Sequence, residues 1–119
     1  MALARLGVVV LDCPDPRALA GFYAEVLGGT VEGDDAWVDL KVPGGPQLAF
    51  QAAAGFVPPG WPSAENSQQF HLDLTVEDLD AAEAGVLALG ARALDAGDRS
   101  RTWRVYADPA GHPFCLCAC

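Results

Sequence analysis

The sequence predicts an α+β fold in which two βαβββ modules pack around a shared cleft. Two observations carry this prediction. The same order of strand-like and helix-like segments occurs twice in 119 residues, and VVVLDCPD (8–15) aligns with HLDLTVED (71–78) at the corner between first strand and helix. A chain of this length can bury its own hydrophobic core. We therefore expect one domain over 1–119, with module one at 1–53, a linker at 54–68 and module two at 69–119.

The first module reads as a strand, a helix and three further strands. The β-branched run over 5–12 suits a buried strand. A helix is predicted over 16–27, because Pro16 can occupy its first turn and Gly28-Gly29 follow its apolar stripe. The segments TVEG, AWVDLKV and QLAFQA are separated by turn residues and complete the module as strands.

The second module repeats this order after the linker, which is rich in Pro, Gly and Ser. QFHLDLTV predicts a strand, residues 77–89 predict a helix that Gly90 ends, and ARALDAG, TWRVYAD and HPFCLCAC predict the last three strands. One helix cannot cover both faces of a four-stranded sheet. The two modules are therefore expected to bury the remaining surface between them and to form the cleft there.

Composition excludes several classes of partner. Sixteen acidic against seven basic residues give a formal charge of -9, which repels nucleic acid and anionic lipid. The apolar runs are too short to span a membrane, and the N-terminal residues lack the features of an export signal. A cytoplasmic location is expected, and with it four reduced cysteines. Residues two apart on a strand lie about 6.5 to 7 Å apart, too far for Cys115, Cys117 and Cys119 to pair comfortably.

Three motifs resemble those of the vicinal oxygen chelate superfamily, which includes glyoxalase I, bleomycin-resistance proteins and extradiol dioxygenases. They are FYAEVLGG in the first helix, FHLDLTVEDLDAA at the start of the second module and DPAGHPF before the last strand. The likeness is greatest to the small bacterial glyoxalase-like branch. It implies the glyoxalase/bleomycin resistance/dihydroxybiphenyl dioxygenase fold, which hosts isomerases, dioxygenases, transferases and non-catalytic drug-binding proteins.

The resemblance also implies where metal-using relatives place their ligands. Those positions fall on Val8 and His71 in the first strands, and on Ala49 and Cys115 in the last strands. Val8 and Ala49 offer no lone pair to an ion. We therefore expect no metal cofactor, and no stoichiometric nickel, zinc, manganese or iron. The fallback is an atypical site of His71, Gln51 and Cys115, to which Asp73 can add a carboxylate.

His71 is the candidate catalytic residue. Imidazole titrates near neutrality, so His71 can act as a general base or polar anchor in an otherwise apolar cleft. The alternative is a structural histidine that hydrogen-bonds to Asp73. Cys115 is a nucleophile only if its pKa is lowered, and an acidic protein tends to raise it. The alternative for the cysteines is a set of small buried apolar side chains.

Aromatic residues complete the predicted binding site. Trp37 and Trp103 occupy similar places in the two modules, and Phe56 and Trp61 stand in the linker, where they could cover a planar ligand or form a dimer contact. The predicted function is to bind a small apolar or aromatic molecule; the alternative is a lyase, isomerase or dioxygenase with a metal or acid-base site around His71. A homodimer is expected. The predicted ligand-binding residues are Val8, Ala49, Gln51, His71, Asp73, Cys115, Trp37, Trp103, Phe56 and Trp61.

Overall fold

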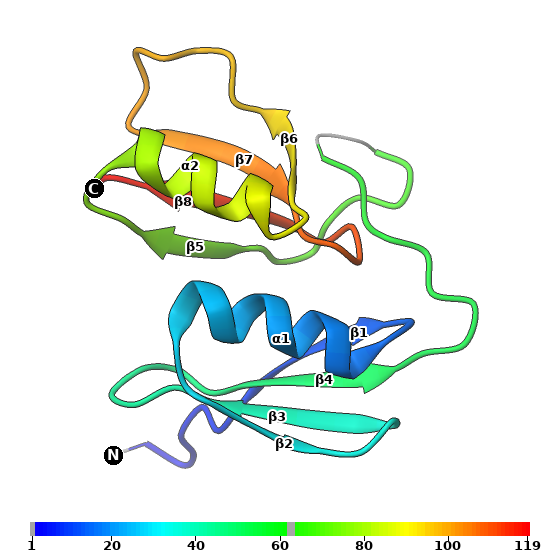
Figure 1. Ribbon diagram of the computed structural model, residues 1–119. Helices are drawn as coiled ribbons and strands as arrows, with labels where there is room; N and C mark the ends of the chain where they lie inside the picture. Colours follow the sequence, from blue (N-terminus) through cyan, green and yellow to red (C-terminus); the bar gives the residue numbers. More distant parts are fainter. Residues whose placement is uncertain (1, 62–63) are drawn as a thin grey trace. The chain divides into compact units, whose positions relative to one another are not determined.

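The computed structural model describes residues 2–61 and 64–119 and divides them between two compact units, 1–56 and 57–119 (Figure 1). Met1 and the linker residues Pro62 and Ser63 lie outside the described part. The elements follow in the order β1 (Val9–Cys13), α1 (Pro16–Leu27), β2 (Thr30–Gly33), β3 (Trp37–Lys41), β4 (Leu48–Ala52), β5 (Leu72–Thr75), α2 (Leu79–Ala88), β6 (Arg92–Asp95), β7 (Trp103–Ala107) and β8 (Pro113–Cys117).

Each unit holds one mixed four-stranded sheet, and the two sheets have equivalent topologies. The strand orders are β1-β4-β3-β2 and β5-β8-β7-β6. The first strand of each unit runs parallel to the last, and the other neighbours are antiparallel. The predicted α+β fold with two βαβββ modules is therefore confirmed. In 30–52, which the structure describes in full, there are only strands and turns.

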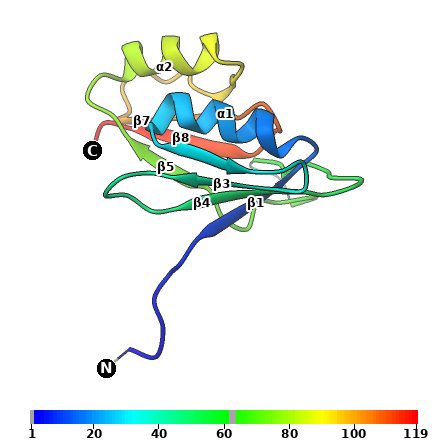
Figure 2. The same cartoon turned by 60° about the horizontal axis from the view of Figure 1, so that its bottom comes forward.

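Helix α1 covers one face of the first sheet (Figure 2) and has the predicted ends. The Asp15 side chain accepts a hydrogen bond from the Ala18 amide at 3.2 Å, and Pro16 needs no partner for an N–H at this position. Gly28 ends the helix at φ 78°, a conformation that favours glycine. The helix buries Tyr23, whose ring stacks on Phe50 of β4 at 5.8 Å between centroids.

Helix α2 begins at Leu79, two residues after the predicted start, because the Asp78 side chain caps it through the Ala81 amide. Polar side chains join this helix to β7. Tyr106 donates a hydrogen bond to Glu83 at 2.8 Å, and Arg104 donates to Asp80 at 2.9 Å and to Glu83 at 3.4 Å. Arg104 and Tyr106 therefore face α2. Trp103 and Val105 alternate with them and face the other side of the sheet.

The first strand of each module begins several residues later than predicted. The first begins at Val9, and residues 2–8 extend away from the first sheet (Figure 2). The other, β5, begins at Leu72, so His71 lies immediately before the strand. Among the described residues, no helix is both long and apolar enough to cross a membrane.

Candidate functional site

A pocket of about 380 Å³ lies in the second unit, on the face of its sheet opposite α2. Strand register places its side chains together: Asp73 pairs with Cys115, and Trp103 pairs with Cys117. Alternate residues of one strand point to the same face, so Cys115 and Cys117 share this face. The lining residues are Trp61, His71, Asp73, Trp103, Cys115, Cys117 and Cys119.

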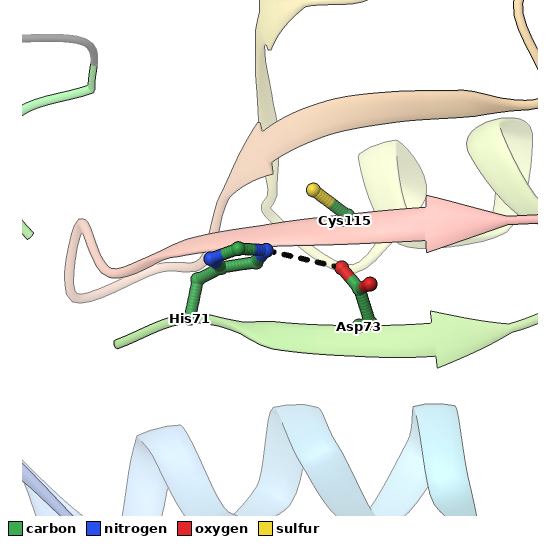
Figure 3. A group of neighbouring side chains, drawn as sticks. All are labelled: His71, Asp73 and Cys115. Atoms are coloured by element: carbon green, nitrogen blue, oxygen red, sulfur yellow. Dashed lines mark hydrogen bonds and ion pairs between the residues drawn. The ribbon is translucent and has the colours of Figure 1, made fainter. Parts of the chain in front are cut away.

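His71, Asp73 and Cys115 form a cluster at this pocket, in which one donor atom from each lies within 4.8 Å of the others. His71 and Asp73 come from the β5 segment and Cys115 from β8 (Figure 3). His71 Nε2 lies 3.1 Å from Asp73 Oδ1. The His71 side chain is 30% exposed, whereas Cys115 is buried. The pocket can therefore present an imidazole to a bound molecule.

The Cys115 thiol is held in its protonated form. Burial raises its pKa to about 12, and the neighbouring Asp73 carboxylate acts in the same direction. A thiol is a weak nucleophile until it ionises. In this environment Cys115 is therefore unsuited to nucleophilic catalysis at neutral pH, in line with the expectation from the acidic composition.

Two tryptophans flank the cluster, each held by another side chain. The Trp61 ring meets the His71 ring edge-on at 4.7 Å between centroids. Arg101 stacks its guanidinium 3.9 Å above the Trp103 ring and donates to the Asp95 carboxylate at 2.9 Å. Arg101 thus covers one side of the Trp103 ring while its charge is paired with Asp95.

The cysteines differ from the prediction of four reduced thiols. Cys117 and Cys119 form a disulfide, so the prediction is wrong for this pair. The estimate of strand spacing failed because β8 ends at Cys117, and beyond that point the Cα atoms of the pair lie 5.4 Å apart. Cys115 keeps a free thiol. Cys13 belongs to the first unit and donates to the Gln51 carbonyl at 3.7 Å.

The equivalent positions of the first unit carry a different chemistry. The pair Val10 and Ala49 in the first sheet is equivalent to Asp73 and Cys115 in the second. Likewise, the pair Trp37 and Gln51 is equivalent to Trp103 and Cys117. By the same register Val8 corresponds to His71. Val8 lines a separate pocket of about 330 Å³ with Asp39, Leu40, Lys41, Gln47 and Leu48, while Phe56 is half-buried in the loop after β4.

The donor atoms of the cluster would fit a hard divalent ion with oxygen ligands poorly. Val8 and Ala49 supply no ligand, and Gln51 lies on β4 of the first unit. The grouped donors are one imidazole nitrogen, one carboxylate oxygen and one sulfur, a mixture typical of zinc and other thiophilic ions. The absence of stoichiometric nickel, zinc, manganese and iron stays a prediction, and among these ions the donor set of the cluster suits zinc best.

Three residues of this region are not among the predicted site residues. Cys117 and Cys119 line the pocket, and Arg101 stacks on Trp103. A signal was present for each: Cys117 follows Cys115 by two residues, and Arg101 precedes Trp103 by two, so on an extended chain each pair shares a face.

The sequence matches the family of glyoxalase-like domains over residues 8–117. No curated protein matches it. Among solved structures it is similar to a glyoxalase/bleomycin resistance protein/dioxygenase family enzyme from Burkholderia phytofirmans, with a TM-score of 0.74, 19% identity, and coverage of 95% of this chain and 97% of that one. A glyoxalase family protein from Enterococcus faecalis has a TM-score of 0.69 and 23% identity, covering 98% and 99% of the two chains. A possible glyoxalase from Bacillus cereus has a TM-score of 0.71 and 15% identity, also covering 98% and 99%. At these identities the likeness concerns the fold.

Proposed function

This chain belongs to the family of glyoxalase-like domains, within the vicinal oxygen chelate superfamily that its motifs resemble. From that premise we propose that it binds a small, planar and mainly apolar molecule in the pocket of the second unit. The observation that carries the proposal is the pocket itself, where two indole rings flank an imidazole. Family membership alone does not choose between binding and catalysis.

The chemistry of the walls supports a planar ligand. Trp61 and Trp103 offer aromatic surface, and stacking on an aromatic ring contributes about 0.5 to 1.5 kcal/mol beyond the burial of area. A volume of about 380 Å³ lies at the small end of ligand pockets and suits a molecule of one or two rings. His71 can donate or accept one hydrogen bond and so orient a hydroxyl or carbonyl group.

The proposal is tested by titrating 1-naphthol and naphthalene against intrinsic tryptophan fluorescence. Trp103→Leu should weaken the binding of both probes by up to about tenfold, the equivalent of the stacking energy. His71→Ala should weaken only 1-naphthol, because naphthalene has no hydroxyl group. The control is Leu87→Ala, which shortens an exposed apolar side chain on α2. Absence of saturable binding, or equal binding by the wild type and Trp103→Leu, would disprove the proposal.

A second candidate is an enzyme, either a lyase, an isomerase or a dioxygenase, with a metal or acid-base site around His71. The grouping of His71 with Asp73 and Cys115 favours it. Elemental analysis of untagged protein separates the two candidates. About one nickel, manganese or iron per chain, lost in His71→Ala, would support the enzyme. The binding proposal expects no stoichiometric nickel, zinc, manganese or iron in protein that keeps the Cys117–Cys119 disulfide.

A further inference from the structure

Three cysteine side chains line the pocket of the second unit, and the proposed binding of a planar molecule uses none of them. Cys115, Cys117 and Cys119 all line it, together with His71 and Asp73. Cys115 and Cys117 lie two residues apart on one face of β8, so their side chains can lean toward a common point between them. Thiolate, imidazole and carboxylate groups are the ligands that Zn²⁺ prefers in proteins.

The oxidation state of one cysteine pair decides how many of these sulfurs can bind an ion. With the Cys117–Cys119 disulfide formed, Cys115 alone offers a thiol to the cluster. Its partners are then His71 and Asp73, which gives three donors within 4.8 Å of one another. A structural zinc site normally has four ligands, so the oxidised cluster lacks one. Opening the disulfide makes Cys117 available beside Cys115.

We propose that reduction of the Cys117–Cys119 disulfide creates a site for one thiophilic divalent ion of the zinc class. Its ligands are Cys115, Cys117, His71 and Asp73. Cys119 is not a ligand. As long as its disulfide with Cys117 persists, Cys117 has no thiolate to offer to the ion. The ion-binding site uses the same pocket as the proposed planar ligand, but the inference does not depend on that ligand.

The chemistry of the switch is a two-electron thiol–disulfide exchange. A dithiol reductant supplies two electrons and two protons, the bond between Cys117 and Cys119 breaks to give two thiols, and the reductant ends as its own disulfide. When the ion binds, Cys115 and Cys117 lose their protons to solvent and coordinate as thiolates.

The proposed ligand Cys117 and its disulfide partner Cys119 can be tested separately, because they lie in different surroundings. Cys117 is buried on β8, whereas Cys119 lies beyond the end of the strand and is exposed. Replacing Cys119 therefore frees Cys117 without disturbing the sheet. Replacing Cys117 also breaks the disulfide, but it removes the proposed ligand. Both variants lack the disulfide, and they should differ in ion binding.

The experiment uses untagged full chain and two probes, Co²⁺ for the sulfur-to-cobalt charge-transfer absorption and Zn²⁺ for affinity. The wild type is compared as oxidised protein and after dithiothreitol treatment, with the reductant removed under anaerobic conditions. We expect the charge-transfer band only after reduction, together with binding of Zn²⁺ at least about 10-fold tighter, since loss of a direct ligand costs no less than loss of a supporting contact.

The variants decide the outcome. Cys119→Ser should show the band without any reductant, and Cys117→Ser should lack it under both conditions. Cys13→Ala, which removes a thiol of the first unit, should behave as the wild type. Circular dichroism checks that each variant is folded. The proposal is overturned if reduced wild type and Cys119→Ser both fail to give the band, if Cys117→Ser retains it, or if oxidised wild type gives it at full strength.

Discussion

The hydrogen bond between Tyr106 and Glu83 should account for a measurable part of the stability of the second unit. Tyr106 is fully buried, the Glu83 side chain is 15% exposed, and the hydroxyl donates to the carboxylate at 2.8 Å. A hydrogen bond to a charged group contributes about 1.5 to 3 kcal/mol. Glu83 keeps Arg99 at 3.0 Å and Arg104 at 3.4 Å as partners. We therefore expect Tyr106→Phe to lower the free energy of unfolding by about 1.5 to 2 kcal/mol, the lower half of that range.

Urea unfolding of the wild type, Tyr106→Phe, Glu83→Gln and the double variant measures the coupling directly. At neutral pH the coupling should reach about 1 kcal/mol or more. Arg99→Gln is the matched control: it removes an exposed partner of the same carboxylate and should cost less than about 0.5 kcal/mol. A coupling no larger than this control would refute the reasoning.

Acidification provides an independent check on the same pair. The Tyr106 hydroxyl, helped by Arg99 and Arg104, holds the pKa of Glu83 below its usual value of 4.5. A carboxyl group with a lowered pKa in the folded state stabilises the protein above its unfolded pKa, and this contribution is lost as pH falls through the folded value. The difference in stability between the wild type and Glu83→Gln should therefore shrink as pH falls below 4.5. A difference that stays constant would mean that the charge of Glu83 contributes nothing.

Three further predictions concern the backbone, an alkaline transition and assembly. Gly29→Ala should destabilise the protein by about 1 to 3 kcal/mol, because Gly29 has φ +103° and an added Cβ would lie 2.5 Å from the Lys41 carbonyl oxygen. Gly21→Ala, in helix α1 with open space around it, should instead stabilise by up to about 1 kcal/mol; thermal unfolding of both variants checks the pair, and equal effects would contradict the argument. Burial raises the pKa of Tyr106 to about 12, so the stability that this phenol contributes should be complete below pH 10 and lost as pH rises from 10 towards 12; an absorbance titration that shows Tyr106 ionising near pH 10 in folded protein would contradict this. The homodimer stays a prediction, to be checked by light scattering against the chain mass of 12.4 kDa, and a monomer at high concentration would exclude it.

Sequence reasoning performed best where local chemistry decides the structure. Helix α1 has the predicted ends, because Pro16 and Gly28 restrict the backbone at those positions whatever surrounds them. The second helix was predicted two residues too early, since Asp78 caps rather than extends it. The alignment of 8–15 with 71–78 agrees with the strand register, which places Val10 and Asp73 at equivalent positions.

The missed features depend on contacts between distant segments. Arg104 is buried, because α2 supplies the carboxylates of Asp80 and Glu83 as its partners, and the sequence alone does not reveal this packing. The link between Cys117 and Cys119 depends on where β8 ends, and alternation of residues could not locate that point. The grouping of His71 with Cys115 needed the parallel pairing of β5 with β8, which follows from the topology of the sheet.

Because the two sheets have matching registers, the first unit provides the same backbone arrangement as the candidate site of the second unit, but without its polar side chains. Val10 pairs with Ala49 as Asp73 pairs with Cys115, and Val8 precedes β1 as His71 precedes β5. Grafting that triad into the first unit with Val8→His, Val10→Asp and Ala49→Cys asks whether backbone geometry alone suffices to recreate its properties. The two triads would then occupy equivalent backbone positions but have different flanking residues, among them Trp61 and Arg101 in the second unit. Comparing the grafted and the native triad would thus distinguish the contribution of the backbone geometry to the properties of the triad from the contribution of the neighbouring side chains.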